Sequence, residues 1–443
     1  MIQLARVVGP AAFGAWSYSQ AWFFYLLRAG EFGLEVTGIR AIARDKSELN
    51  QRASWVLTLR LGMAAALFGL VVLLVFAGVI PSGSSNLVVL FSLGVFPVAI
   101  SLEWLYEAVQ RTRNVGLARV LKGSLFFLFV VLAVKGSEDL AKSAIYYTLS
   151  LSIPAVLLLL VARREFGFGR LGLSWQKAKE LLKEAWPIAI ATLFSQYSLF
   201  FSTIFLGYAA SERELGFFTA AHRLIVFVWA YGIVASNRVI LPTLSNYFRE
   251  SEEKYGEFLR NVTRVLAIVA LPIGVIGCVV ARDFINLLFG PQFSSSSGVF
   301  QILVWALVVA VTRSGLEIGL IATQKQNLYL RGMAFVAVLH TVLAPIGYAL
   351  NGIAGVATAM LVAETSYAAY LVFVTRSPRI TRVTVSVWRI PAAAALTLFL
   401  LLVVPMPLVL AILSGVVVYG GTLVLLGELS SADRLVLRQL VGI

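Results

Sequence analysis

A small set of ionisable side chains stands inside stretches of sequence that are otherwise long and apolar. They are Arg28, Glu31, Glu35, Arg223, Arg313, Glu317 and Glu364. Charge at membrane depth is costly, so such residues usually face the interior of a helix bundle or a water-filled cavity. Each of them is therefore a candidate for binding a charged ligand, for coupling to an ion, or for joining helices.

The three arginines suit a ligand that carries phosphate. A guanidinium group keeps its charge and donates in a fork that matches two oxygens of one anion. An interior that presents Arg28, Arg223 and Arg313 would attract an anionic lipid headgroup, and we expect these residues to bind substrate. The other interpretation is that each arginine is neutralised by a nearby carboxylate and serves packing.

Spacing indicates which charges can meet. Arg28, Glu31 and Glu35 are three and four residues apart, which places them on one face of a helix and lets Arg28 pair with Glu31. Arg313 and Glu317 form a second pair at a spacing of four, whereas the acidic residue near position 364 stands alone in its segment. Two roles remain open for the carboxylates: they could couple transport to a proton or another ion, or they could form structural ion pairs. These residues are Glu31, Glu35, Glu317 and Glu364.

Other kinds of chemistry find no support in the sequence. It contains one cysteine and neither a P-loop, an HExxH pattern, a paired CxxC nor the glycines of a dinucleotide-binding turn. We therefore predict no metal, no cofactor and no catalytic residue.

The composition sets the class of protein. Of 443 residues 59% are hydrophobic and 13% are charged, and the mean hydropathy is +0.88. A soluble globular chain is about 45–50% apolar and about 25% charged. A soluble fold, a disordered chain and a disulfide scaffold are excluded, and an all-α polytopic membrane protein remains.

Transmembrane helices need about 20 consecutive, mostly apolar residues. Thirteen segments meet this criterion in the sequence: 13–37, 54–79, 87–108, 117–134, 143–162, 187–207, 216–240, 262–281, 298–322, 332–349, 353–374, 390–405 and 408–427. We expect two bundles of about six helices around a central cavity, followed by two trailing helices.

The basic residues orient the chain. Alternate connections carry 28 of the 36 lysines and arginines, the opposite connections carry five, and three lie within segments. The rich side is cytoplasmic by the positive-inside rule, so we expect the C-terminus in the cytoplasm. The net charge of +14 then reflects topology and predicts no nucleic-acid partner. The first cluster holds Arg40, Arg44, Lys46, Arg52 and Arg60, and the last two hold Arg376, Arg379, Arg382, Arg389, Arg434 and Arg438.

The same count bears on the organisation of the chain. Thirteen segments with a cytoplasmic C-terminus put residue 1 outside, so we expect a further helix upstream; the alternative is a genuine protein of thirteen segments. Gly14-Ala-Trp-Ser and Gly216-Phe-Phe-Thr open two segments in a similar way, which is weak support for a repeat. The predicted parts are an N-terminal bundle, a cytoplasmic amphipathic linker helix, a C-terminal bundle and the trailing helices with a tail: 1–162, 163–186, 187–374 and 375–443.

Several short runs, taken together, resemble a known family. Ala5-Arg-Val-Val-Gly-Pro-Ala-Ala-Phe-Gly14 is similar to the pattern A-R-x-L-G-P-x-x-Y/F-G, and Glu31-Phe-Gly-Leu with Ile39-Arg-Ala-Ile-Ala-Arg44 to D-x-G-h … R-x-I-A. Three later runs match in order and spacing: Gly216-Phe-Phe-Thr-Ala-Ala-His-Arg223, Leu241-Pro-Thr-Leu-Ser245 and Gly290-Pro-Gln-Phe. The family is that of bacterial polysaccharide and O-antigen flippases, in the multidrug/oligosaccharidyl-lipid/polysaccharide exporter superfamily. Glu31, where Asp is usual, and His222, beside the arginine, depart from its pattern.

The resemblance implies a fold, a transporter rather than an enzyme, and a substrate. The family typically has fourteen helices, so most of the first one would be missing here. Its members move a polyprenyl-diphosphate-linked oligosaccharide, such as an O-antigen or exopolysaccharide repeat unit, between leaflets by alternating access. Membrane lipids are then partners, and polysaccharide polymerase machinery is left open as another.

Three other functions remain open on the sequence. A lipid II flippase is the nearest. A drug or metabolite antiporter of the same superfamily would favour an acidic interior, against which the arginines argue. A membrane glycosyltransferase or polymerase would need an acidic cluster in a sizeable loop, and the predicted outside loops are short.

Overall fold

A computed structural model describes residues 1–167, 172–375 and 389–428, and over these ranges the chain consists of helices and their connections. Internal contacts divide it into two compact units, Met1–Gly216 (unit 1) and Phe217–Ile443 (unit 2). Most of the predicted last two basic clusters lies outside the described residues, because only Arg389 among them belongs to a described helix, α16. The polytopic all-α class is confirmed. The four-part division of the chain stays a prediction.

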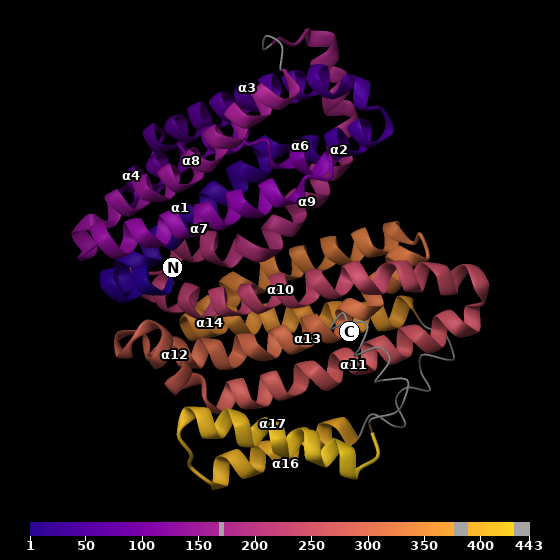
Figure 1. Ribbon diagram of the computed structural model, residues 1–443. Helices are drawn as coiled ribbons and strands as arrows, with labels where there is room; N and C mark the ends of the chain where they lie inside the picture. Colours follow the sequence, from indigo (N-terminus) through magenta and orange to yellow (C-terminus); the bar gives the residue numbers. More distant parts are fainter. Residues whose placement is uncertain (168–171, 376–388, 429–443) are drawn as a thin grey trace. The chain divides into compact units, whose positions relative to one another are not determined.

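Unit 1 contains nine α-helices and the first residues of a tenth among its described residues (Figure 1). Their bounds are α1 (Ile2–Glu31), α2 (Leu34–Arg44), α3 (Leu49–Phe76), α4 (Ser82–Ser92), α5 (Val95–Ile100), α6 (Glu103–Ala108), α7 (Thr112–Ala133), α8 (Leu140–Phe166), α9 (Trp175–Ala209) and α10 (Glu212–Glu250). The predicted segment 87–108 is therefore not one helix but three short pieces in line. Short pieces within one apolar stretch recur where transporters build binding sites.

Unit 2 contains the rest of α10 and six further described α-helices. They are α11 (Glu252–Val279), α12 (Ala281–Phe289), α13 (Ser296–Ala322), α14 (Gln326–Val374), α16 (Arg389–Val403) and α17 (Leu408–Leu425). Within α14 the chain bends at Asn351 and Gly352, whose φ is +53°, between the predicted segments 332–349 and 353–374. The two halves approach closely there, because a Cβ atom on Gly355 would lie 1.8 Å from the carbonyl oxygen of Gly347.

Residues 175–186 of the predicted linker segment form the start of α9. Ser174 caps the helix by accepting a hydrogen bond from the Lys177 amide at 3.3 Å, and the helix then continues to Ala209 through Pro187. A proline inside a membrane helix is tolerated because neighbouring helices can accommodate the freed carbonyl. Leu181 and Ala185 are buried in the core of unit 1, so this segment is the first part of a long helix.

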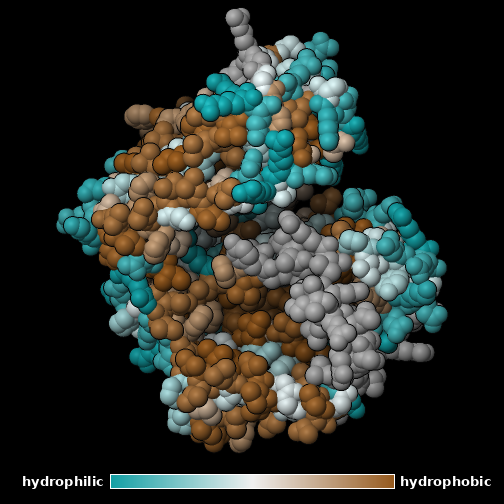
Figure 2. All heavy atoms as spheres, viewed as in Figure 1, coloured by the Kyte–Doolittle hydropathy of each residue, from teal (hydrophilic) through white to brown (hydrophobic). Residues whose placement is uncertain are grey.

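The surface is that of a membrane protein. Figure 2 shows apolar side chains over the middle of the helices and hydrophilic ones gathered toward their ends. In unit 1 exposed apolar side chains recur along α3 and α7, among them Leu73 (63%), Phe76 (88%), Val120 (67%) and Leu132 (65%). Extended apolar surface of this kind marks contact with a membrane or another protein. Among the described residues, nine helical stretches are long and apolar enough to cross a membrane. The predicted segments 13–37 and 216–240 lie on α1, α2 and α10, which carry more polar residues.

Candidate functional site

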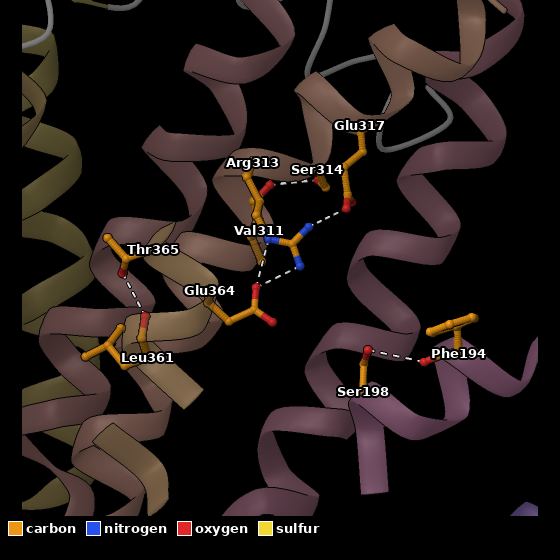
Figure 3. A network of polar contacts seen from close by, with 9 residues as sticks. All are labelled: Phe194, Ser198, Val311, Arg313, Ser314, Glu317, Leu361, Glu364 and Thr365. Carbon is orange, nitrogen blue, oxygen red and sulfur yellow. Dashed lines mark hydrogen bonds and ion pairs between the residues drawn. The ribbon is translucent and has the colours of Figure 1, made fainter. Parts of the chain in front are cut away.

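Three charged side chains of unit 2 meet around Arg313 of α13 (Figure 3). Its guanidinium contacts a carboxylate of Glu364 on α14 twice, from Nε at 2.8 Å and from Nη2 at 2.7 Å. Nη1 donates to Glu317, one helical turn further along α13. The predicted pair of Arg313 with Glu317 is thus confirmed. Glu364 stands alone in its own segment, and the packing of α13 against α14 brings it to the same guanidinium.

This network is nearly enclosed and carries more negative than positive charge. The exposed fractions of the side chains are 9% for Arg313, 17% for Glu317 and 15% for Glu364. The ring of Tyr367, which is fully buried, stacks on the guanidinium with 4.5 Å from its centroid to Cζ. Arg313 is therefore held by two carboxylates and an aromatic face. An anionic ligand could bind it only if at least one carboxylate moved away.

Arg223, the second predicted arginine of unit 2, lies in α10 and is half-buried. His222 beside it is 3% exposed and stacks on Phe218, with 5.6 Å between the ring centroids. The two neighbours therefore differ in role: the histidine packs into the unit, whereas the arginine reaches a partly open environment. Its predicted contact with substrate stays a prediction.

The predicted cluster of unit 1 is divided by a break in the helix. Arg28 and Glu31 form an ion pair at 2.6 Å, as their spacing predicts, and the Arg28 side chain remains 44% exposed. Glu35 does not continue their face. Helix α1 ends at Glu31, and α2 starts at Leu34. Between them, Phe32 and Gly33 adopt left-handed backbone angles, with φ of +45° and +72°. The expectation of one continuous face over these residues is wrong because the glycine allows the chain to turn there.

Glu35 pairs instead with a residue that sequence reasoning placed elsewhere. Arg60 of α3, counted above among the cytoplasmic basic residues, is 1% exposed and lies 3.1 Å from the Glu35 carboxylate. It also donates to the carbonyl oxygens of Val98, at 2.7 Å, and Ser101, at 3.3 Å. A signal for it existed in the sequence, because Arg60 stands within the apolar segment 54–79.

Within the described residues, no three His, Cys, Asp or Glu side chains come close enough together to hold a metal ion. What the two clusters show is a set of ion pairs. Unit 1 presents one partly exposed arginine with a single carboxylate partner, and unit 2 presents an enclosed arginine with two.

Comparison with known proteins identifies the family. The family model described as polysaccharide biosynthesis protein matches residues 1–248, more than half of the chain. The chain belongs to the polysaccharide biosynthesis protein family. This confirms the resemblance drawn from Ala5–Gly14 and the later runs.

Relatives of known name and structure agree with that assignment. The chain is 19% identical to a putative O-antigen transporter of Escherichia coli strain K12 over 319 residues, which are 68% of this chain and 73% of that protein. In fold it is similar to the lipid II flippase MurJ in an inward closed conformation, with a TM-score of 0.78 at 13% identity, covering 96% of this chain and 95% of that one. An inward-facing multidrug resistance MATE family transporter of the MOP superfamily gives a TM-score of 0.64 at 16% identity over 87% of this chain and 96% of that one. The fold of this family member is thus that of a multi-pass transporter.

Proposed function

We propose that this protein is a flippase that moves a polyprenyl-diphosphate-linked oligosaccharide, an O-antigen or exopolysaccharide repeat unit, across the bacterial inner membrane by alternating access. The family match over residues 1–248 carries this proposal. The relative named as a putative O-antigen transporter supports the substrate class, and the transporter fold supports the mechanism.

The diphosphate is the part of such a substrate that arginines recognise. We assign Arg28, Arg223 and Arg313 to it, because bidentate guanidinium contacts hold phosphate oxygens with permanent charge. Arg28 fits this role best on its contacts: it is 44% exposed and has one carboxylate partner, Glu31, for the diphosphate to replace. Arg313 fits it least well, because its guanidinium is already held by both Glu317 and Glu364.

The carboxylates have a separate part in the proposal. Arg313 with its two acidic partners has an excess of one negative charge in an enclosed site, and a proton or other cation would balance it. We therefore assign Glu317 and Glu364 to coupling with an ion gradient. Glu31 and Glu35, whose partners are Arg28 and Arg60, serve as ion-pair partners that are released or re-formed during transport.

Orientation and partners follow from the same function. The C-terminus lies in the cytoplasm, where the bias of basic residues places it. Membrane lipids surround the apolar surface, and polysaccharide polymerase machinery receives the translocated unit.

Complementation tests the function directly. The chain is expressed in a strain that lacks its O-antigen flippase, and surface polysaccharide is measured alongside the amount of protein in the membrane. We expect restored polymer with the wild-type chain, loss of polymer with Arg28→Ala, and no effect of Arg331→Ala, an exposed arginine of α14 that serves as the matched control. Absence of polymer with an abundant wild-type chain would contradict the proposed substrate.

One observation favours a second candidate. The fold likeness to the lipid II flippase MurJ extends over 96% of the chain. The same plasmid is therefore placed in a strain depleted of its lipid II flippase. If the chain supports growth of this strain but does not restore O-antigen in the first strain, its substrate is lipid II instead.

A further inference from the structure

Arg60 joins two breaks that lie far apart in the sequence but side by side in unit 1. Its guanidinium reaches Glu35, just after the break between α1 and α2, and two carbonyl oxygens at the break between α5 and α6. The side chain is buried, and α3, which carries it, runs without interruption from Leu49 to Phe76. One residue on a continuous helix thus holds two discontinuous ones.

The first break is a strained turn. Phe32 has a φ of +45°, a left-handed angle that non-glycine residues seldom adopt, and its amide donates to Arg28 O at 3.1 Å as the last contact of α1. Helix α2 then begins with Glu35 in its first turn, where a carboxylate also faces the positive end of the helix dipole. Strained backbone of this kind persists only where surrounding contacts hold it in place.

The second break leaves the Ser101 carbonyl group without the amide that an uninterrupted helix would give it. The Leu105 amide, which an uninterrupted helix would direct to Ser101 O, donates to Leu102 O at 3.0 Å instead. Ser101 itself is extended, with a ψ of 129°. Arg60 donates to Ser101 O, and so satisfies a polar group that would otherwise face an apolar interior. It also donates to Val98 O, which accepts from the Ser101 amide at 3.1 Å as well.

The two short helices beyond the breaks pack against each other. The Trp104 side chain of α6 covers Gly38 of α2 so closely that a Cβ atom there would lie 2.6 Å from the ring. Leu34, Ile42 and Leu105 belong to the same buried cluster of unit 1. We call α2 and α6 the α2–α6 pair. Each helix of the pair follows one of the two breaks, and the pair also packs on α3, α7 and α9 through the same buried cluster.

We propose that Arg60 is a positioning residue for transport: it anchors the α2–α6 pair to α3, and the pair turns as one piece about Phe32–Gly33 and Ser101–Leu102. This inference rests on the proposed function, because Arg28, the proposed diphosphate ligand, lies one turn before the first break. Arg60 keeps its contacts with the two carbonyl groups, whereas its contact with Glu35 exchanges as the pair moves. The permanent charge and forked donors of arginine suit three acceptors at once.

Distances between spin labels test the anchor without reference to any substrate. In a Cys278→Ser background, cysteines replace Arg40 on α2, Gln110 just after α6 and Ala65 on α3, all exposed positions, and the three pairwise distances are measured in lipid vesicles. In the Arg60→Met variant we expect the distributions from Ala65 to each of the other two sites to broaden. The distribution between the labels on α2 and α6 should stay as narrow as in the wild type.

Other variants separate the anchor from general structure. Glu35→Gln keeps both carbonyl contacts, which lie at the end of α5, but removes the ion pair that ties Arg60 to α2. It should broaden the distances from Ala65 about as much as Arg60→Met does, and it serves as the test if Arg60→Met fails to fold. Arg60→Lys keeps the charge but not the fork, and we expect it to lose polysaccharide export while remaining in the membrane.

Two results would overturn the anchor. One is unchanged distances from Ala65 in both Arg60→Met and Glu35→Gln. The other is a distance between the labels on α2 and α6 that broadens as much as the rest. A wild-type chain that fails complementation leaves the distance test intact, so failure of the proposed function is distinguishable from failure of the anchor.

Discussion

Replacing Arg313 by methionine gives a quantitative test of the network between α13 and α14. Methionine keeps a long apolar side chain but leaves Glu317 and Glu364 without the cation that joins them. Removing one partner of a buried ion pair costs about 3–5 kcal/mol, mainly because the remaining charge stays buried. Both carboxylates are slightly exposed, at 17% and 15%, so we place the cost at about 3 kcal/mol, toward the lower end of that range.

The expected effect can be measured as a melting temperature in detergent. For a folded unit of roughly this size, 1 kcal/mol corresponds to about 2–4 °C, so Arg313→Met should melt about 6–12 °C below the wild type. The triple variant R313M/E317Q/E364Q removes all of the charges together. It should recover most of the loss, because replacing a whole buried ion cluster by neutral groups is often close to neutral in stability.

Glu364→Gln is the matched single variant. It leaves Arg313 paired with Glu317 alone, in balance, so its melting temperature should lie near that of the wild type. The reasoning is refuted if Arg313→Met melts like the wild type, or if the triple variant melts as low as the single one. In either case the stability of the network would not depend on its charge balance.

Three further changes test packing and charge at other places. Gly216→Leu should destabilise the protein by about 1–3 kcal/mol in the same melting assay, because its Cβ atom would lie 1.9 Å from the carbonyl oxygen of Pro10, whereas Gly62→Leu, with open space around it, should not. Glu428→Gln should lower the melting temperature, because this 1% exposed carboxylate joins arginines of α11 and α16; an unchanged value would show that the two helices are held by apolar contacts alone. Glu184→Gln should change stability by less than about 1 kcal/mol, because its carboxylate is 49% exposed in its pair with an arginine of α3.

The positions of the helices could be predicted from the sequence because a bilayer demands long apolar segments with few charges. The bend of α14 was also predictable, since Asn351 and Gly352 interrupt the apolar run at the place where the backbone turns. The breaks at Ser101 and Phe32 were harder to see. Glu103 follows Ser101 within two residues, but a single charge does not show where the backbone breaks. The turn after Glu31 depends on a left-handed angle at a phenylalanine, which composition does not indicate.

The ion pairs also fall into two groups, those that the sequence predicts and those that it does not. Arg28 with Glu31 and Arg313 with Glu317 lie within one helix, so spacing alone predicted them. Glu364 reaches its arginine from another helix, 51 residues further along the chain, and this depends on how helices pack. Long-range pairs of this kind are set by tertiary contacts that periodicity does not encode.

Charge balance, more than the presence of arginine, decides which of these residues can bind a diphosphate. A guanidinium with two carboxylates presents net negative charge to an anion, and binding a ligand there means leaving at least one of the two acids unpaired in the apolar interior. A guanidinium with one carboxylate is neutral, and the anion replaces that partner one for one. Arg28 has one carboxylate partner and is partly exposed, whereas Arg313 has two and is enclosed. Loss of Arg28 should therefore abolish export without destabilising the protein, and loss of Arg313 should destabilise the protein before any effect on binding is seen.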